Sequence, residues 1–248
     1  MRLKKLSTAM FIAVESVLYA AFLCADLTGS YDTGILIKYA SIVLCALFAV
    51  ISAAQPMIAV AMGFTLLADT FLLLLDKNTA GLISFAAVQT VYLIVIQNIN
   101  AARQTSFRKP PILLIIRVAA RMMAAYVIYA AAAGPAMGEG LFTAVTCFYA
   151  VSFIDNIAYL TAGLFANRQK TAYPHPVMLL AGLVLFALCD INVAFFNTSA
   201  FVEVDSPLLL RLIGASDYLM WAFYLPGQVL IVLSGVAFDF FSKTEKTS

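Results

Sequence analysis

The dominant pattern along the chain is a series of apolar runs, each about twenty residues long, separated by short polar breaks. A helix of about 20 residues spans the roughly 30 Å hydrocarbon core of a bilayer, whereas a membrane β-barrel needs alternating segments of about ten residues. The breaks carry glycine, proline, asparagine or aspartate, which end helices. The pattern therefore predicts eight membrane-spanning helices, at about 8–27, 34–53, 56–75, 79–98, 111–133, 140–166, 176–197 and 215–238.

Two further segments bear on this count. The first apolar run follows basic residues and resembles a signal peptide. Glu15 interrupts it, however, and the run continues beyond the usual 7–15 apolar residues, so we expect it to be retained as a first span. The segment SPLLLRLIG (206–214) is too short to span, and we expect it to lie along the membrane interface.

Composition supports a membrane protein. Hydrophobic residues make up 63% of the 248 positions and charged residues only 11%, whereas about a quarter of a soluble protein is charged. This excludes a cytosolic enzyme, a secreted disulfide scaffold and a disordered chain. A net charge of +2, carried by scattered residues, does not suit a nucleic-acid partner. We expect an all-α polytopic membrane helix bundle that forms a single transmembrane domain over 1–248, and the pattern does not specify its oligomeric state.

The distribution of basic residues predicts the orientation. With the N-terminus in the cytoplasm, ten of the fifteen lysines and arginines fall in cytoplasmic segments, and the opposite loops hold Lys77 and Arg211. This is a strong positive-inside bias. We therefore expect a multi-pass protein of the cell membrane with both termini in the cytoplasm.

Residues that hold metals or cofactors are sparse. Cys24, Cys45, Cys147 and Cys189 lie inside apolar runs without CxxC spacing, and His175 is the only histidine. This pattern suits neither a zinc site nor a disulfide framework, and it excludes a zinc-dependent membrane hydrolase. Neither a P-loop nor a GxGxxG motif occurs. We expect no metal and no organic cofactor.

Charged residues inside the predicted spans are the first functional candidates. Such a group costs at least about 2.5–3.5 kcal/mol at the bilayer centre, so it faces the bundle interior. The outer half holds Lys38, Asp69 and Asp190, with Asp217 near the outer end of the last span. Three carboxylates and one lysine at similar depth would repel one another if all were ionised. We expect at least one aspartate to stay protonated, which would place an acid and a base in one dry pocket.

Uncharged polar residues lie nearer the middle of the membrane. Gln89 and Tyr92 are three residues apart and Tyr224 and Gln228 are four apart, so each pair shares a helix face. Between the second pair lies Pro226-Gly227, which indicates either a simple kink or a backbone opening that lines a cavity, as in transporters.

The inner half carries charges of both signs. Arg117 and Arg121 lie one turn apart, and Glu15 and Asp155 lie at similar depth. Two arginines against two acids indicate a structural ion-pair network. A site for an anionic lipid headgroup is the alternative.

Five short segments, in this order and spacing, resemble the YhhN/TMEM86 membrane family, whose eight-span members include lysoplasmalogenases. The resemblance covers nearly the whole chain. The chain departs from the family pattern most clearly at Gln89, where histidine is common, and less so at Tyr39, Ala68 and Cys189. The segments are IKYASIVLCAL with Lys38, LLADTFLLL with Asp69, VQTVYLIVI with Gln89 and Tyr92, LFALCDINVAF with Asp190, and YLMWAFYLPGQVLIVLS with Tyr224 and Gln228.

The resemblance implies hydrolysis of the vinyl-ether bond of a lysoplasmalogen to a fatty aldehyde and a glycerophospho-base. Asp69 and Asp190 would be the catalytic acid and base, in either order. The expected partners are the lysophospholipid or plasmalogen substrate and membrane lipids. A non-catalytic lipid-binding protein and a small lipid or solute transporter remain alternatives. Residues expected to bind substrate are Lys38, Gln89, Tyr92, Asp217, Tyr224 and Gln228.

Overall fold

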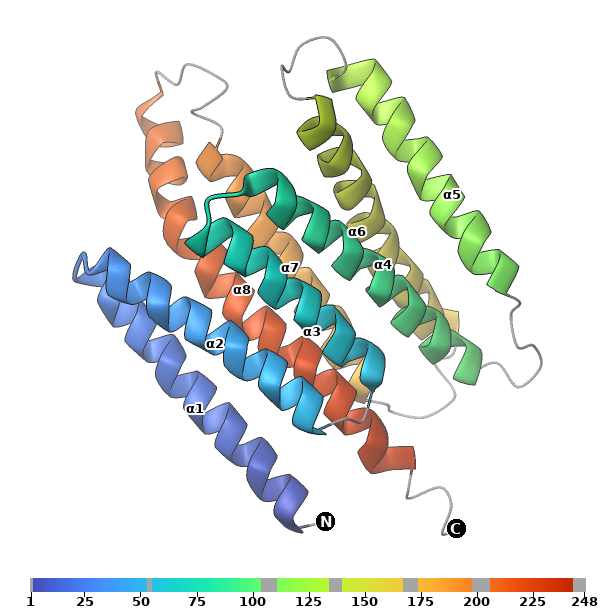
Figure 1. Ribbon diagram of the computed structural model, residues 1–248, viewed down its shortest axis with the longest axis horizontal. Helices are drawn as coiled ribbons and strands as arrows, with labels where there is room; N and C mark the ends of the chain where they lie inside the picture. The colour runs from blue at the N-terminus through green and yellow to red at the C-terminus, as the bar shows by residue number, and fades with distance from the viewer. Residues whose placement is uncertain are drawn as a thin grey trace.

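The chain folds into a bundle of long helices, seen in a computed structural model that describes residues 2–52, 55–103, 111–133, 140–166, 174–197 and 206–242 (Figure 1). Within these ranges every regular element is helical. The elements are α1 (Arg2–Leu27), α2 (Tyr31–Ser52), α3 (Pro56–Asp69), the π-helical turn η1 (Thr70–Leu74), α4 (Asn78–Arg103), α5 (Pro111–Ile128), the π-helical turn η2 (Tyr129–Ala133), α6 (Gly140–Ala166), α7 (Pro174–Asn197) and α8 (Pro207–Ser242).

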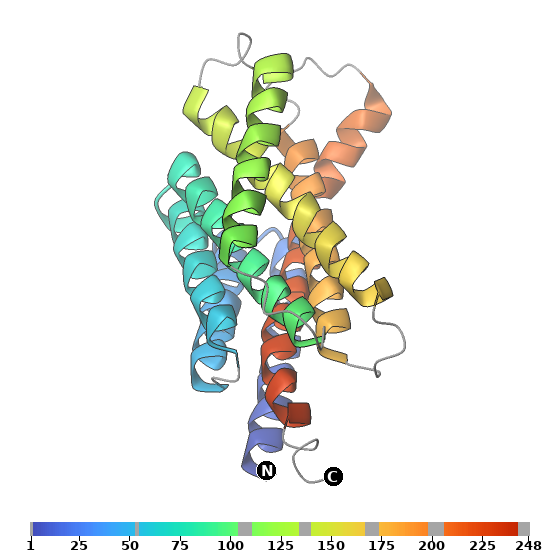
Figure 2. The same cartoon turned by 90° about the vertical axis from the view of Figure 1, so that its right-hand side faces the viewer.

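Eight of these helical segments are long and apolar enough to cross a membrane, which confirms the predicted all-α fold and the predicted number of spans. The described part of α1 begins, and that of α8 ends, at the same end of the bundle (Figures 1 and 2). An even number of spans produces this arrangement. We call the opposite end, where α2 and α4 begin, the far end.

The expectation that 206–214 lies apart from the last span is wrong. This segment is the beginning of α8, which runs without a break from Pro207 to Ser242. Proline is well tolerated in the first turn of a helix, and the Leu210 amide donates to the Ser206 carbonyl oxygen to close that turn. Gly214 does not stop the helix, because a glycine inside a helix costs only about 1 kcal/mol.

The Pro226-Gly227 pair also lies inside a continuous helix. Gly227 allows α8 to approach α7 closely: a Cβ atom at Gly182 of α7 would lie 2.8 Å from the Gly227 carbonyl oxygen. Small residues at facing positions let membrane helices pack backbone against backbone. Close helix packing therefore accounts for Gly227, a role that neither sequence interpretation included.

The centre of the bundle is formed by α4, which lies between α3 and α6 (Figure 1). At the far end α3 and α4 form a tight antiparallel pair. Gly81 makes this possible, since a Cβ atom there would lie 2.6 Å from the side chain of Leu72 and 3.2 Å from the Ala68 carbonyl oxygen. This pairing places the end of α3, and with it Asp69, against the first turns of α4.

Candidate active site

Asp69 is the last residue of α3, and the π-helical turn η1 begins at the next residue. Its side chain is buried, with 3% of its surface exposed. The Tyr224 hydroxyl of α8 donates a hydrogen bond of 2.7 Å to Asp69 Oδ2. The π-helical turn η1 ends this span, so Asp69 lies about one turn from its end.

Asp190 of α7 has a similar partner. The Tyr149 hydroxyl of α6 donates a hydrogen bond of 2.6 Å to Asp190 Oδ2. Asp190 is only partly buried, in contrast to Asp69. Cys189 is close enough to both carboxyl groups to interact electrostatically with each of them. The two aspartates therefore lie in one region of the bundle, and each is held by its own tyrosine.

Aromatic rings connect the two tyrosines. Phe85 of α4 contacts both of them, with ring centroids 6.2 Å from Tyr149 and 6.4 Å from Tyr224. Phe186 of α7 contacts Tyr224 at 5.3 Å, and Phe153 of α6 joins Phe186 to Tyr149 at 5.1 and 5.7 Å. The two carboxyl groups are therefore attached to a continuous apolar cluster of five rings from four helices.

Polar side chains without partners lie near this cluster. Tyr92 of α4 is within electrostatic range of both Tyr149 and Tyr224. Its hydroxyl is close to Thr65 of α3, yet the geometry falls short of a hydrogen bond and both oxygens are buried without a partner. Gln89 and Gln228 are fully buried, and Gln89 Nε2 and both polar atoms of Gln228 have no partner. Such groups are costly unless a ligand or water satisfies them.

The predicted ion-pair network in the inner half is correct for three of its four members. Arg117 and Arg121 of α5 both bind Asp155 of α6, through Arg117 Nε at 2.8 Å and Arg121 Nε at 2.7 Å. Arg121 Nη2 also donates to Asn156 Oδ1 at 2.7 Å, and Asn156 Nδ2 donates to Gln89 Oε1 at 2.9 Å. The network therefore reaches α4 and the buried amide of Gln89.

The expectation that Glu15 belongs to this network is wrong. Glu15 lies on α1, and its carboxyl oxygens accept hydrogen bonds from Ser41 Oγ at 2.5 Å and Cys45 Sγ at 3.4 Å, both on α2. α1 packs against α2 and α8, whereas the arginines are on α5, which packs mainly on α6. Similar depth in the membrane therefore correctly predicted the ion pair of Arg117 with Asp155, but it wrongly grouped Glu15 with them.

Lys38 forms an ion pair that the sequence interpretation did not include. Its Nζ lies 2.7 Å from Asp26 Oδ2, and both side chains are buried. Nζ also lies over the rings of Trp221 at 5.1 Å and Phe22 at 5.5 Å. Trp221 in turn contacts Tyr224 at 5.4 Å. Lys38 is thus joined to Asp69 through two aromatic rings of α8, and its direct carboxylate partner is Asp26.

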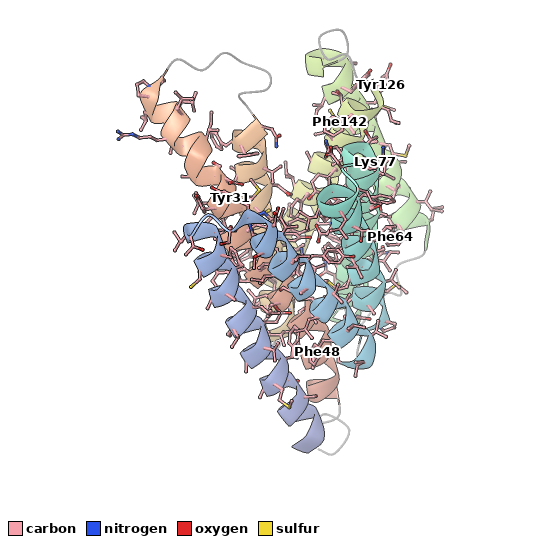
Figure 3. All side chains as sticks on the ribbon, turned by 60° about the vertical axis from the view of Figure 1, so that its left-hand side comes forward. Tyr31, Phe48, Phe64, Lys77, Tyr126 and Phe142 are labelled. Carbon is pink, nitrogen blue, oxygen red and sulfur yellow. The ribbon has the colours of Figure 1, made fainter. Side chains whose placement is uncertain are left out.

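Asp217 lies apart from the aspartate pair. It is partly exposed on α8, and with Asp26 it is within electrostatic range of Tyr218. Tyr218 interacts with Tyr31, which lies at the far end of the bundle beside α8 (Figure 3). Asp217 therefore belongs to the rim at this end, and any contact with substrate there remains a prediction.

Sequence reasoning missed two residues that hold the site together, namely Tyr149 and Asp26. Each is a hydrogen-bond or ion-pair partner of a predicted residue. Asn156 could be placed beside Asp155 in the inner half, but its bond to Gln89 could not be predicted. A signal for Tyr149 was present on α6, where Tyr149, Ser152, Phe153 and Asn156 follow helical spacing and are all buried.

Among the described residues, no group of three or more histidine, cysteine, aspartate or glutamate side chains could hold a metal ion. The chemical groups at the site are carboxyl groups, phenols, carboxamides and one thiol. They can donate and accept protons and can form hydrogen bonds with oxygen atoms.

Comparison with known proteins now identifies the chain. A model of the YhhN family matches residues 33–235. The chain belongs to the YhhN family. No curated protein and no solved structure matches it. The range matched by the YhhN family runs from the beginning of α2 almost to the end of α8. It therefore contains all eight residues that the sequence predicts for the site.

Proposed function

We propose that this YhhN-family membrane protein is a lysoplasmalogenase-like hydrolase that cleaves the vinyl-ether bond of lysoplasmalogens. The observation that carries the proposal is the pair of tyrosine-bonded carboxyl groups, Asp69 with Tyr224 and Asp190 with Tyr149, attached to one aromatic cluster. A vinyl ether is hydrolysed by acid, and two carboxyl groups can supply the acid and the base. The aromatic cluster gives both carboxyl groups apolar surroundings, which suit a vinyl ether with a long alkenyl chain.

The first step is a proton transfer to carbon. One aspartate, in its protonated form, gives its proton to the β-carbon of the vinyl ether, and the double-bond electrons form the new C–H bond. The ether oxygen shares a lone pair with the α-carbon, which becomes an oxocarbenium ion. The second carboxylate stabilises this cation, as one carboxylate of a glycosidase does for a similar ion.

The second step consumes water. Water adds to the α-carbon while the carboxylate accepts its proton, and a hemiacetal forms. The hemiacetal then collapses. Its hydroxyl group gives its proton to the first aspartate, the bond from the α-carbon to the glycerol oxygen breaks, the glycerol oxygen takes the proton that the second aspartate had accepted, and the fatty aldehyde leaves. One water is consumed in each turnover, and both aspartates return to their starting protonation states.

The phenol hydroxyls have a direct role in this scheme. Each tyrosine donates to one carboxyl oxygen and so fixes the direction in which the other oxygen points. Gln89, Tyr92 and Gln228 supply buried polar atoms that can hold the water and the oxygens of the lipid. Lys38 acts on Asp69 only indirectly, through Trp221 and Tyr224.

The test is aldehyde release by the detergent-purified protein. Lysoplasmalogen is the substrate, and a saturated 1-O-alkyl lysophospholipid is the control, because it lacks the double bond that accepts the proton. We expect aldehyde from the vinyl ether only. Asp69→Asn and Asp190→Asn should each abolish release while the folded yield is unchanged, and wild-type rates in both variants would exclude the mechanism.

A non-catalytic lipid-binding protein is the main rival, because Gln89 stands where the family pattern commonly has histidine, and glutamine cannot carry a proton at neutral pH. Tight lysolipid binding by the wild-type protein without aldehyde release would favour it. A small lipid or solute transporter is the other rival. The contact of Gly227 with Gly182 gives the glycine of Pro226-Gly227 a packing role, and uptake without chemical change in proteoliposomes would favour the transporter.

A further inference from the structure

A buried chain of hydrogen bonds runs from Arg121 of α5 through Asn156 of α6 to Gln89 of α4, and it sets the orientation of the Gln89 amide. Arg121 Nη2 donates to Asn156 Oδ1 at 2.7 Å, Asn156 Nδ2 donates to Gln89 Oε1 at 2.9 Å, and Asn156 Nδ2 also lies 2.8 Å from the Gln89 carbonyl oxygen. Asn156 and Gln89 are fully buried, and 3% of the Arg121 side chain is exposed.

Chemistry fixes the direction of each bond. A guanidinium group only donates, so the Asn156 atom beside Arg121 must be the oxygen. The Asn156 amide nitrogen then faces Gln89 and donates twice. The Gln89 atom that receives this bond must therefore be Oε1, although the two ends of a carboxamide have nearly the same shape. Arg121 therefore sets the orientation of the Gln89 amide, although Asn156 lies between the two side chains.

This orientation leaves Gln89 Nε2 as a buried donor without a partner. Tyr92 lies one turn further along the same face of α4, and its hydroxyl is also unpartnered and within electrostatic range of Tyr224. A buried donor left unpaired costs about 1–3 kcal/mol. Gln89 Nε2 is therefore placed to donate a hydrogen bond to an acceptor atom of a ligand.

The charge around Gln89 indicates the nature of that acceptor. Lys38 is paired with Asp26. Arg117 and Arg121 share the single carboxylate of Asp155, and Arg121 directs Nε to Asp155 and Nη2 to Asn156. The group that faces Gln89 is therefore the neutral amide of Asn156 and not a guanidinium group that could bind a phosphate. A neutral amide donor suits an uncharged oxygen, such as the ether or hydroxyl oxygen of a glycerol backbone.

We propose that Arg121 and Asn156 are positioning residues that hold Gln89 as a hydrogen-bond donor to an ether or hydroxyl oxygen of the bound lipid. The inference rests on the proposed function for the identity of the lipid class. It extends that function by assigning the contact to the glycerol oxygens rather than to the phosphate.

The first test separates the donor from the shape of the side chain. Gln89→Met has nearly the same length but no donor, whereas Gln89→His can accept from Asn156 with one ring nitrogen and donate with the other. The probe is a non-hydrolysable 1-O-alkyl lysophosphocholine, and its dissociation constant is measured for each folded variant. We expect binding about tenfold weaker in Gln89→Met and close to wild type in Gln89→His.

The second test asks whether Asn156 acts through Gln89. Asn156→Leu should weaken probe binding several-fold in the wild-type background and have no further effect in Gln89→Met. A merely structural role would weaken binding in both backgrounds. Asn100→Leu is the matched control, because Asn100 is another buried amide that joins α4 to α6, through the Tyr159 carbonyl oxygen at 3.4 Å. If Asn156→Leu does not fold, Asn156→Ala takes its place.

The outcomes discriminate between the two proposals. Absence of aldehyde from the wild-type protein would overturn the proposed hydrolase, while the order of probe affinities would still test the role of Gln89. Equal binding by wild type and Gln89→Met, with or without a fall in turnover, would overturn the contact with the lipid. Failure of the wild-type protein to bind the probe would overturn it as well.

Discussion

The two aspartates differ in what surrounds them, although each accepts one phenolic hydrogen bond. Asp69 is enclosed at the junction of α3 and η1, whereas Asp190 is partly exposed on α7. Protein atoms surround both carboxyl groups, but Asp190 as a whole keeps more accessible surface than Asp69. The base of the proposed reaction must meet water, so we propose Asp190 as the base and Asp69 as the acid.

Small carboxylates test this assignment. Asp190→Ala removes the base and leaves a space that an added formate ion can fill. We expect formate to raise aldehyde release by Asp190→Ala about tenfold or more and to leave Asp69→Ala inactive. Aldehyde release is measured over a formate series at constant ionic strength, with sodium chloride as the control. Restoration of Asp69→Ala alone would reverse the two roles.

The tyrosine hydroxyls provide a second test. Tyr224→Phe and Tyr149→Phe leave the ring packing intact but leave a carboxyl oxygen without its donor. We expect turnover to fall roughly 10- to 100-fold in each, with stability lowered by only about 0.5–1.5 kcal/mol. Turnover and thermal unfolding in detergent are measured together. Tyr126→Phe is the control, since Tyr126 is 66% exposed on α5 and should be unaffected. Wild-type turnover in both site variants would remove the tyrosines from the mechanism.

The sequence predicted both aspartates and Tyr224 as site residues, but it did not pair Tyr224 with Asp69 and it missed Tyr149, for a physical reason. An acidic residue in an apolar run must face the bundle interior, so Asp69 and Asp190 could be found from their own surroundings. Their partners are distant along the chain: Tyr149 precedes Asp190 by 41 residues and Tyr224 follows Asp69 by 155. A tyrosine in a membrane helix is common enough that only the packing of α6 and α8 selects these two.

At the scale of helices, α7 and α8 form a pair with backbones in close contact, and α7 carries Asp190 while α8 carries Tyr224. A Cβ atom at Gly182 would lie 2.8 Å from the Gly227 carbonyl oxygen and 2.7 Å from the Ile231 side chain. The spacing of this pair therefore fixes the position of one catalytic candidate relative to the partner of the other.

Gly182→Ala tests the importance of this spacing. The added methyl group must push α7 away from α8, so we expect stability to fall by about 1–3 kcal/mol and turnover to fall with it. Thermal unfolding and aldehyde release are measured on the same preparation. Gly63→Ala is the control, because a Cβ atom at Gly63 of α3 meets nothing within 4 Å. Equal stability of the two variants would show that the α7–α8 contact tolerates expansion.

The pair of Lys38 and Asp26 joins α1 to α2 in a similar way. Lys38→Met leaves Asp26 buried without a cation, and we expect a loss of about 3–5 kcal/mol in unfolding free energy. Lys38→Met combined with Asp26→Asn removes both charges and should recover most of this loss. Unfolding is followed in detergent for the two single variants and the double variant. If the double variant is less stable than either single variant, the loss in Lys38→Met does not come from the unpaired charge of Asp26, and the prediction is wrong.

For the whole molecule, eight spans place both ends of the described chain at one end of the bundle (Figures 1 and 2). Asp69 at the end of α3 and Asp190 in the last third of α7 lie toward the other end. Of the ten lysines and arginines expected on the side of the termini, Arg2, Lys4, Lys5 and Arg103 belong to described helix ends on that side, and the other six fall outside the described residues. The helix count could be predicted because span length and apolar composition are local properties. The close packing of α7 on α8 and the ion pair between α1 and α2 depend on contacts across the bundle.

Orientation is the prediction that belongs to this scale. The excess of basic residues on the side of the termini predicts that both termini are cytoplasmic and that Lys77, exposed between η1 and α4 at the far end, is on the opposite face (Figure 3). We expect Lys77→Cys, in a Cys24→Ala background, to react with a membrane-impermeant maleimide in intact cells. Epitope tags at either terminus should become accessible to protease only after the membrane is opened. The reverse pattern would place the rim near Asp217 on the cytoplasmic side, so that a lysolipid of the cytoplasmic leaflet would meet it first.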